Sequence, residues 1–273
     1  MSAALTKDEF DFIAGLLKQR SGLALTEDKG YLIETRLQPI AKSNGLADVR
    51  ELIGKLRVNP PLALVNHVVE SMTTNESMFF RDMKPFDLLI KHVLPQFKAA
   101  GRNNLRIWSA ACSTGQEPYS IAMAFKEEAA KYPGLTFEII ATDLAGKVLD
   151  RSRDGIYSQF EVQRGLPIQY LMKYFTQAPG NMWKISDSLK PNIKFQPGNL
   201  LESFFSLGKF DLVFCRNVLI YFDEKTKSDV LDRIAGQLNP PGYLFLGGAE
   251  STFGLTQKFT ASSEHRGLFT LAV

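Results

Sequence analysis

The sequence predicts an α/β protein with a mostly parallel sheet, preceded by a small all-helical domain. From residue 5 to about residue 70, apolar side chains recur with the period of a helix. From about residue 104 onward, short apolar segments bounded by Gly, Asp, Asn or Pro alternate with helical patterns. Such alternation is typical of parallel strands that are buried on both faces and connected by helices.

The composition is typical of a globular protein and gives no sign of a membrane-spanning segment or a signal peptide. The 273-residue chain is 45% hydrophobic and 22% charged, as ordinary globular proteins are. It contains no apolar run of the roughly 18 residues that a membrane-spanning helix needs. Its N-terminus also lacks the basic start and the long apolar stretch of a signal peptide. We therefore expect a cytoplasmic protein that does not insert into a membrane.

The charge balance argues against nucleic acid as a partner. The formal net charge is only +3, and residues 1–70 contain nine Lys or Arg and nine Asp or Glu. A domain that binds duplex nucleic acid usually carries a concentrated basic excess. The sequence therefore favours another kind of partner for the helical domain.

Helix signals divide the first 70 residues into helices. Thr6 and Glu9 form a capping box before the first helix, and Gly22 is suited to end it. Thr26 is expected to cap the second helix, which Pro39 is expected to kink or divide. Two more helices are expected over residues 47–59 and 61–73.

The remaining chain predicts the sheet and its connections. Expected parallel strands lie within residues 105–111, 137–143, 193–199, 211–222 and 242–248. Segments near 259–264 and 267–273 are expected to add an antiparallel edge pair. Residues 154–192 are longer than a simple connection needs, which indicates an inserted subdomain. We therefore expect a helical domain over 1–70, an interdomain segment over 71–85 and an α/β domain over 86–273.

A ligand is expected at the carboxyl ends of the parallel strands. The first strand runs into the small-residue loop 108–118, which contains Gly115 but lacks the GxGxxG pattern of dinucleotide-binding loops. S-adenosylmethionine carries a nucleoside without a phosphate, so a loop of this kind is compatible with it. A plain strand-to-helix turn is the alternative interpretation.

Asp143 ends the second expected strand, 28 residues beyond Gly115. An acidic residue at this place commonly binds ribose hydroxyls, and a carboxylate can accept from both of them. Asp is also a good helix cap, and a helical pattern follows directly. The sequence leaves both roles open.

The fourth expected strand ends in Arg216 and Asn217, which a buried run should not carry unless something satisfies them. A bound polar ligand would do so, and an internal salt bridge is the alternative. Tyr221 would stand just beyond this strand, with a hydroxyl able to orient a substrate group. The nearby NPPGY at 239–243 resembles a motif of amino-group methyltransferases, but it follows the wrong strand and is interpreted as a turn.

Other residues receive simpler interpretations. Cys112 and Cys215 lie in apolar contexts and are expected to be small buried residues without a metal or a disulfide. The three histidines, His67, His92 and His265, fall outside the strand-end motifs and are expected to be structural or surface residues. By contrast, the polar and aromatic segment TTNESMFFRD at 73–82 is suited to a cofactor lid.

These motifs together resemble the CheR-type chemotaxis receptor methyltransferases, essentially from end to end. The resemblance lies in TTNESMFFRD, WSAACSTGQEPYSIA, ATD, GNLLE, FDLVFCRNVLIYF and LGGAES. It implies a Rossmann-like class I methyltransferase fold, S-adenosylmethionine as methyl donor with S-adenosylhomocysteine as product, and no metal. The cofactor contacts that it implies are Asn75, Ser77, Arg81, Glu117, Asp143, Asn199, Leu200, Arg216 and Asn217.

The resemblance also implies a substrate: glutamate side chains in the cytoplasmic domains of methyl-accepting chemotaxis receptors, with Tyr221 near the transferred methyl group. Arg36 matches the basic helix face that meets the receptor, whereas Gln38 and Ile40 are not basic. The stretch FTQAPGNMWKI at 175–185 is short for a loop that binds a receptor pentapeptide. We therefore expect an enzyme that works without this tether.

Three rival functions follow from the same residues. The chain could methylate small molecules or RNA, although the neutral helical domain argues against RNA. It could also bind S-adenosylmethionine as a signalling or sensor module without turnover. A Rossmann dehydrogenase is disfavoured because the glycine pattern is missing.

Overall fold

The computed structural model describes residues 5–272, which form two compact units. The helical unit extends to Thr74 and also includes the later segment Tyr221–Thr226. The α/β unit comprises Asn75–Ile220 and the chain from Lys227 onward. Tyr221, although it follows the fourth parallel strand in sequence, therefore belongs to the helical unit.

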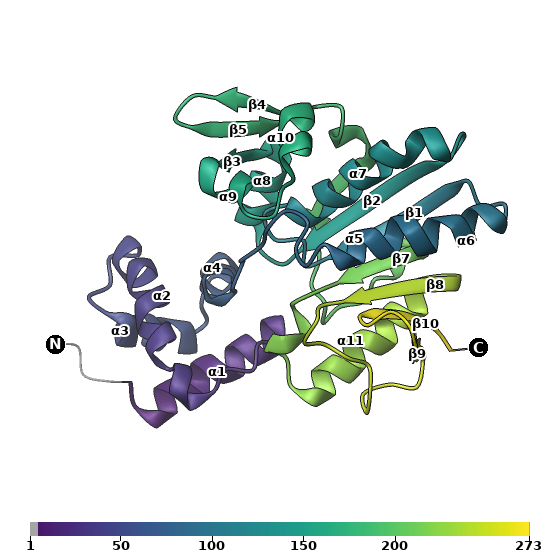
Figure 1. Cartoon of the computed structure of the whole chain (residues 1–273). Helices are drawn as coiled ribbons and strands as arrows, with labels where there is room; N and C mark the ends of the chain where they lie inside the picture. Colours follow the sequence, from purple (N-terminus) through teal and green to yellow (C-terminus); the bar gives the residue numbers. More distant parts are fainter. Residues whose placement is uncertain (1–4, 273) are drawn as a thin grey trace. The chain divides into compact units, whose positions relative to one another are not determined.

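The helical unit contains the helices that the apolar period predicts. They are α1 (Lys7–Ser21), α2 (Tyr31–Ser43), α3 (Val49–Arg57) and α4 (Leu62–Met72), labelled in Figure 1. The capping box is present: the Thr6 hydroxyl accepts from the Glu9 N–H, and the Glu9 carboxylate accepts from the Thr6 N–H. Gly22 ends α1 in the left-handed conformation, as expected.

The structure contradicts the expected cap at Thr26 and the expected division of α2 at Pro39. Thr26 makes no side-chain cap, because a 3-10 turn over Glu27–Lys29 intervenes and α2 begins only at Tyr31. Pro39 does not divide α2, which continues through it to Ser43. Pro39 is exposed and has no backbone N–H to donate within the helix. Packing of the opposite, buried face keeps the helix intact there. This face consists of Ile33, Leu37, Ile40 and Ala41.

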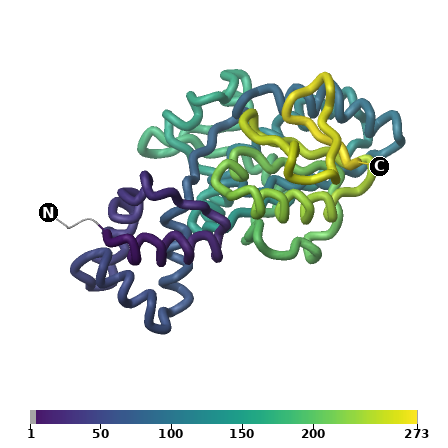
Figure 2. The backbone as a smooth tube through the Cα atoms, turned by 90° about the horizontal axis from the view of Figure 1, so that it is seen from below, coloured from purple at the N-terminus to yellow at the C-terminus, as the bar shows by residue number. Residues whose placement is uncertain are grey.

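The α/β unit confirms the predicted fold class. Its main sheet is seven-stranded within residues 5–272, in the order β6-β2-β1-β7-β8-β10-β9. The strands are β1 (Asn104–Ala110), β2 (Thr136–Asp143), β6 (Ile193–Pro197), β7 (Phe210–Cys215), β8 (Leu238–Leu246), β9 (Phe259–Ala261) and β10 (Leu268–Leu271). The first five in this order pair in parallel, and β10 and β9 add the expected antiparallel edge, yellow in Figure 2.

Side chains alternate between the two faces of this sheet. Ile107 and Phe214 belong to the large apolar cluster that includes Phe97 and Phe125 from the helices on one face. Their strand neighbour Trp108 instead packs against Phe204 and Phe210, outside that cluster. The strands are therefore buried on both faces, as their continuous apolar runs predict.

Helices cover the sheet and connect its strands. They are α5 (Lys84–Leu88), η2 (Leu89–Val93), α6 (Leu94–Ala99), α7 (Gln116–Glu128), α8 (Gly146–Asp154) and α11 (Glu224–Gln237). In Figure 1, α5, α6 and α7 lie together along the sheet. Within residues 5–272 no helix has the length and apolar character needed to cross a membrane.

The chain between α8 and β6 forms a separate small sheet. Its strands β3 (Ile156–Ser158), β5 (Met182–Ile185) and β4 (Phe175–Ala178) pair antiparallel in the order β3-β5-β4. Helices α9 (Gln159–Gln163) and α10 (Ile168–Tyr174) complete this inserted subdomain.

The NPPG sequence is not a separate turn, which corrects the expectation. It forms the irregular first part of β8, where the pairing with β7 shifts register between Phe210 and Leu212. The prolines cannot donate to the ladder, which accounts for the irregular pairing there. This segment lies near the amino end of β8. It is therefore far from the edge of the sheet where the carboxyl ends of the parallel strands meet.

Candidate functional site

The loop between β1 and α7 brings backbone to the carboxyl edge of the sheet in an unusual conformation. Ala111 and Ser113 have φ values of 56° and 51°, and Gly115 has a φ of 92°. Non-glycine residues rarely adopt such angles, and when they do the surrounding structure must hold them there.

Hydrogen bonds from three other elements hold this loop. The Cys112 N–H donates to the Thr142 carbonyl at the end of β2 (2.9 Å). The Ser152 hydroxyl on α8 donates to the Ser113 carbonyl (3.0 Å), and the buried Tyr157 hydroxyl on β3 donates to the Thr114 carbonyl (2.8 Å). The loop is therefore a preformed structure rather than a simple turn.

Asp143 lies beside this loop with its side chain buried. Its Oδ2 accepts from the Ser113 N–H (2.8 Å), and its Oδ1 accepts from the Ala145 N–H (3.0 Å) just before α8. This second bond closes a turn before α8, whose N-cap residue is Ala145 and has no side-chain cap. These bonds fix the carboxylate at the carboxyl edge of the sheet, next to the small-residue loop.

The end of β6 approaches β2 closely at Gly198, where a Cβ would lie 2.8 Å from the Thr142 Cβ. The Asn199 side chain beyond it accepts from the Leu201 N–H (3.0 Å), and the buried Leu200 offers its carbonyl to Arg233 (3.0 Å). Asn199 and Leu200 therefore follow β6 at the same edge as Asp143.

Arg216 is the most buried cation at this edge, with 2% of its side chain exposed. Its Nη1 donates to Glu117 (3.0 Å), and its Nη2 donates to Asp82 and to the Arg81 carbonyl (both 2.8 Å). The second oxygen of Glu117 accepts from the Ser109 hydroxyl (2.8 Å). The salt-bridge interpretation of Arg216 is therefore correct, and its Nε is buried without a partner within residues 5–272.

The segment from Asn75 to Met83 is fixed across the same strand ends. The Ser113 hydroxyl donates to the Asn75 carbonyl (2.7 Å), and the Phe80 N–H donates to the Ser120 hydroxyl (2.9 Å). Arg216 ties down Arg81 and Asp82, as described above. Nearby, the half-buried Ser77 and Arg81 side chains lie on this segment, with Arg81 donating weakly to the Glu76 carbonyl (3.4 Å).

The sequence interpretation gave no role to Glu250, which follows β8. Its carboxylate accepts from the N–H groups of Gly247, Asn217, Val218 and Leu219, at 2.7 to 2.9 Å. The available signal was an acidic residue four positions after the end of β8, in the LGGAES motif. This carboxylate holds Asn217, whose φ of 58° is left-handed and whose Oδ1 is buried without a partner in the described chain.

Two predicted residues, Tyr221 and Arg36, lie in the helical unit. Tyr221 is half-buried on a 3-10 turn, and its carbonyl accepts from the Ala24 N–H (2.9 Å). Arg36 donates to the Met72 and Thr73 carbonyls (2.6 and 3.0 Å), at the end of α4. The other nine predicted residues belong to the α/β unit.

The cysteines are buried as predicted, and burial raises the pKa of both the Cys112 and Cys215 thiols well above the usual value. Both thiols are therefore neutral near pH 7 and are unsuited to act as nucleophiles. Among the residues that the structure describes, no group of three or more His, Cys, Asp or Glu side chains could hold a metal ion.

Comparison with known proteins identifies the family. The family model of the CheR methyltransferase SAM binding domain matches residues 75–268, and that of the CheR methyltransferase all-alpha domain matches residues 8–73. The chain belongs to the CheR methyltransferase family. It is therefore an S-adenosylmethionine-dependent methyltransferase.

Named relatives of this family cover nearly the whole chain. The chemotaxis protein methyltransferase Cher2 of Pseudomonas putida is 41% identical over 92% of this chain and 93% of its own. Chemotaxis protein methyltransferase 1 of Vibrio cholerae is 41% identical over 93% of both chains, and that of Pseudomonas aeruginosa is 41% identical over 95% of both. A solved magnesium protoporphyrin IX methyltransferase from Synechocystis is 16% identical over 82% of this chain and 74% of its own, with a TM-score of 0.35, too distant for any argument.

The residues at the strand ends fit the cofactor of this family. Asp143 places a buried carboxylate, an acceptor suited to hydroxyl groups, beside a loop whose small residues allow close approach of a nucleoside. Nε of Arg216 and Oδ1 of Asn217 are buried polar atoms without a partner in the described chain, which in native structures calls for an explanation.

The Arg216 network generates a stability prediction. Arg216→Ala leaves the Glu117 carboxylate, whose side chain is 13% exposed, without its cationic partner. We expect the free energy of unfolding to fall by about 3 kcal/mol, measured by urea denaturation. The exposed pair Lys91–Asp87 supplies the control, since Lys91→Ala should cost at most about 0.5 kcal/mol. A loss below about 1 kcal/mol for Arg216→Ala would contradict the assigned role.

Proposed function

We propose that this methyltransferase esterifies glutamate side chains in the cytoplasmic domains of methyl-accepting chemotaxis receptors, as part of chemotaxis adaptation. The observation that carries the proposal is the 41% identity, over more than nine tenths of the chain, to proteins named chemotaxis protein methyltransferase. A receptor substrate of this kind also places the enzyme in the cytoplasm.

The strand-end residues of the α/β unit are proposed to bind S-adenosylmethionine, which supplies an electrophilic methyl group on a sulfonium. Asp143 is assigned to the ribose because its carboxylate lies buried at the end of β2, beside the loop after β1. Arg81, half-buried and only weakly bonded, is suited to the carboxylate of the cofactor. The full proposed set is Asn75, Ser77, Arg81, Glu117, Asp143, Asn199, Leu200, Arg216 and Asn217.

The reaction needs no general base. A glutamate side chain ordinarily has a pKa of about 4.3 and is ionised near pH 7, so the nucleophile is already present. What the protein must supply is alignment, which can lower a barrier by as much as about 7–11 kcal/mol. Tyr221 is proposed to orient the glutamate carboxylate by donating a hydrogen bond from its hydroxyl.

The helical unit is proposed to recognise the receptor, with Arg36 as one contact. Three donations from Arg36 stay within the helical unit, to the Met72 and Thr73 carbonyls and the Thr74 hydroxyl. A guanidinium carries five N–H groups, so it retains donors for an acidic receptor surface. We further propose that the enzyme works without a receptor pentapeptide tether, because the turn between β4 and β5 spans only residues 179–181.

A labelling experiment tests the proposed function. The protein is incubated with methyl-labelled S-adenosylmethionine and receptor-containing bacterial membranes, and mild base is then added. We expect labelled methanol from a receptor-sized band, because methyl esters are base-labile. Receptors that lack their last five residues should be labelled to the same extent, whereas strong loss of label would contradict tether independence.

The other outcomes of this experiment separate the rival functions. Label that survives base would indicate N- or C-methylation and overturn the glutamate assignment. Cofactor binding without any label, while a known active methyltransferase labels the same membranes, would favour a sensor module without turnover.

The role of Tyr221 is tested separately. Tyr221→Phe removes only the hydroxyl, so we expect kcat for receptor methylation to fall at least about tenfold, with little change in the S-adenosylmethionine Kd by calorimetry. Tyr31→Phe, at an exposed tyrosine of the same unit, is the control and should leave kcat unchanged. An unchanged kcat for Tyr221→Phe would remove this residue from the mechanism.

A further inference from the structure

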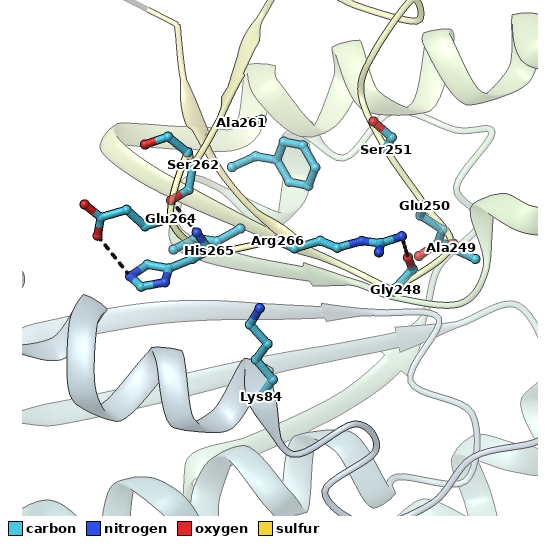
Figure 3. A pocket seen from close by; sticks show the side chains of 14 residues that line it. Lys84, Gly248, Ala249, Glu250, Ser251, Ala261, Ser262, Glu264, His265 and Arg266 are labelled. Carbon is cyan, nitrogen blue, oxygen red and sulfur yellow. Dashed lines mark hydrogen bonds and ion pairs between the residues drawn. The ribbon is translucent and has the colours of Figure 1, made fainter.

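Glu250 lies beyond the point where the pairing between the neighbouring strands β7 and β8 ends. The parallel pairing of β7 with β8 ends at Cys215 opposite Leu246. The N–H groups just beyond this point belong to the turn Asn217–Leu219 on one side and to Gly247 on the other. Figure 3 shows Glu250 on the loop that continues from Gly248 and Ala249, at the rim of a pocket of about 470 Å³.

Beyond the last β7–β8 pair, the Glu250 carboxylate accepts from the backbone N–H groups in place of strand carbonyls. Oε2 of Glu250 accepts from Asn217 and Gly247 (2.8 and 2.7 Å), and Oε1 accepts from Val218 and Leu219 (2.9 and 2.8 Å). Hydrogen bonds to an ionised acceptor are roughly twice as strong as neutral ones. The turn after β7 is therefore held by a side chain that reaches it from the loop after β8.

Gly247 makes this arrangement possible. A Cβ at this position would lie 2.7 Å from both Glu250 Oε2 and Asn217 Nδ2, distances that real Cβ atoms do not show. The adjacent Gly248 has nothing within 4 Å of its Cβ position and no positive φ. The two neighbouring glycines thus differ: only the first is required by the carboxylate and by the Asn217 side chain.

We propose that Glu250 is a positioning residue for methyl transfer, which fixes the turn that presents Asn217 to the cofactor. The inference rests on the proposed role of Asn217 in cofactor binding. Asn217 has a left-handed backbone and a buried Oδ1 without a partner in the described chain, so its orientation depends on the turn that carries it. The same turn leads in sequence to Tyr221.

The test uses the full-length protein with two variants that attack the arrangement differently. Glu250→Gln keeps the size of the side chain, but its NH2 group faces N–H donors and can accept from none of them. Gly247→Ala crowds the carboxylate and Asn217 without removing either. Gly248→Ala and Glu264→Gln are the controls, because Gly248 has open space and Glu264 is largely exposed, with only a 3.9 Å contact to His265.

We expect both test variants to speed hydrogen exchange at the amides of Asn217, Val218, Leu219 and Gly247, while amides in the β7–β8 ladder keep their protection. The S-adenosylmethionine Kd, measured by calorimetry, should rise at least about tenfold, which corresponds to the loss of one charge-assisted hydrogen bond or more. The kcat for methyl transfer should fall as well, with little change in KM for the receptor. Both controls should match the unaltered protein in every readout.

Three other outcomes would each contradict a different step: the hydrogen bonds of Glu250, its effect on methyl transfer, or the proposed cofactor site. Unchanged exchange at the four amides in Glu250→Gln would overturn the inference at its structural step. Faster exchange with unaltered Kd and kcat would mean that Glu250 only stabilises the fold. If the unaltered protein bound no S-adenosylmethionine, the proposed cofactor site would be wrong, independently of Glu250.

Discussion

At the carboxyl edge of the sheet, the backbone beyond the strand ends is no longer paired with a neighbouring strand. Much of this backbone is buried, so its N–H and C=O groups need other hydrogen-bond partners. Two carboxylates each bind several of these groups. Asp143 accepts from the loop after β1 and from the start of α8, and Glu250 accepts from the ends of both β7 and β8. Arg216 supplies the third connection, from β7 to Glu117 and to the segment at Asp82. The shape of the candidate site depends on these three side chains.

This edge has the properties that a methyltransferase of this family needs. Under the proposed transfer from a sulfonium to a carboxylate, no proton has to move, so catalysis depends on geometry and on the exclusion of water. A loop held by hydrogen bonds from β2, β3 and α8 does not have to be ordered when a ligand binds, which lowers the entropic cost of binding. The glutamate substrate and the tether-free mode of action extend this account as proposals.

Much of the fold followed from patterns that are local in sequence. The period of apolar residues predicted the helices of the first unit and the buried parallel strands, and the capping box at Thr6 was visible because its two members are three residues apart. Pro39 does not divide α2, because a proline on the exposed side of a well-packed helix is tolerated. Thr26 was misleading because the chain inserts a 3-10 turn before α2.

Candidate site residues could be predicted from the residues themselves only where a polar side chain stood at the end of a buried strand. Asp143 and Arg216 were singled out because polar residues at the ends of buried strands demand an explanation, although their partners could not be read from the sequence. The residues that hold the loop, Ser152 and Tyr157, lie 39 and 43 residues from their acceptors. Such partnerships are set by tertiary packing. Glu250 was missed for the same reason, since it acts on a turn more than 30 residues earlier.

The central claim, that the cofactor's ribose lies against Asp143, is tested most directly by calorimetry on Asp143→Asn. The amide keeps one acceptor oxygen, but its NH2 group faces either the Ser113 or the Ala145 N–H, so the loop and the ribose both lose an acceptor. The account predicts an S-adenosylmethionine Kd at least about tenfold higher than that of the unaltered protein, with an unchanged Kd for Asp150→Asn on exposed α8 surface. An unaltered Kd for Asp143→Asn, in a protein shown to be folded by circular dichroism, would contradict it.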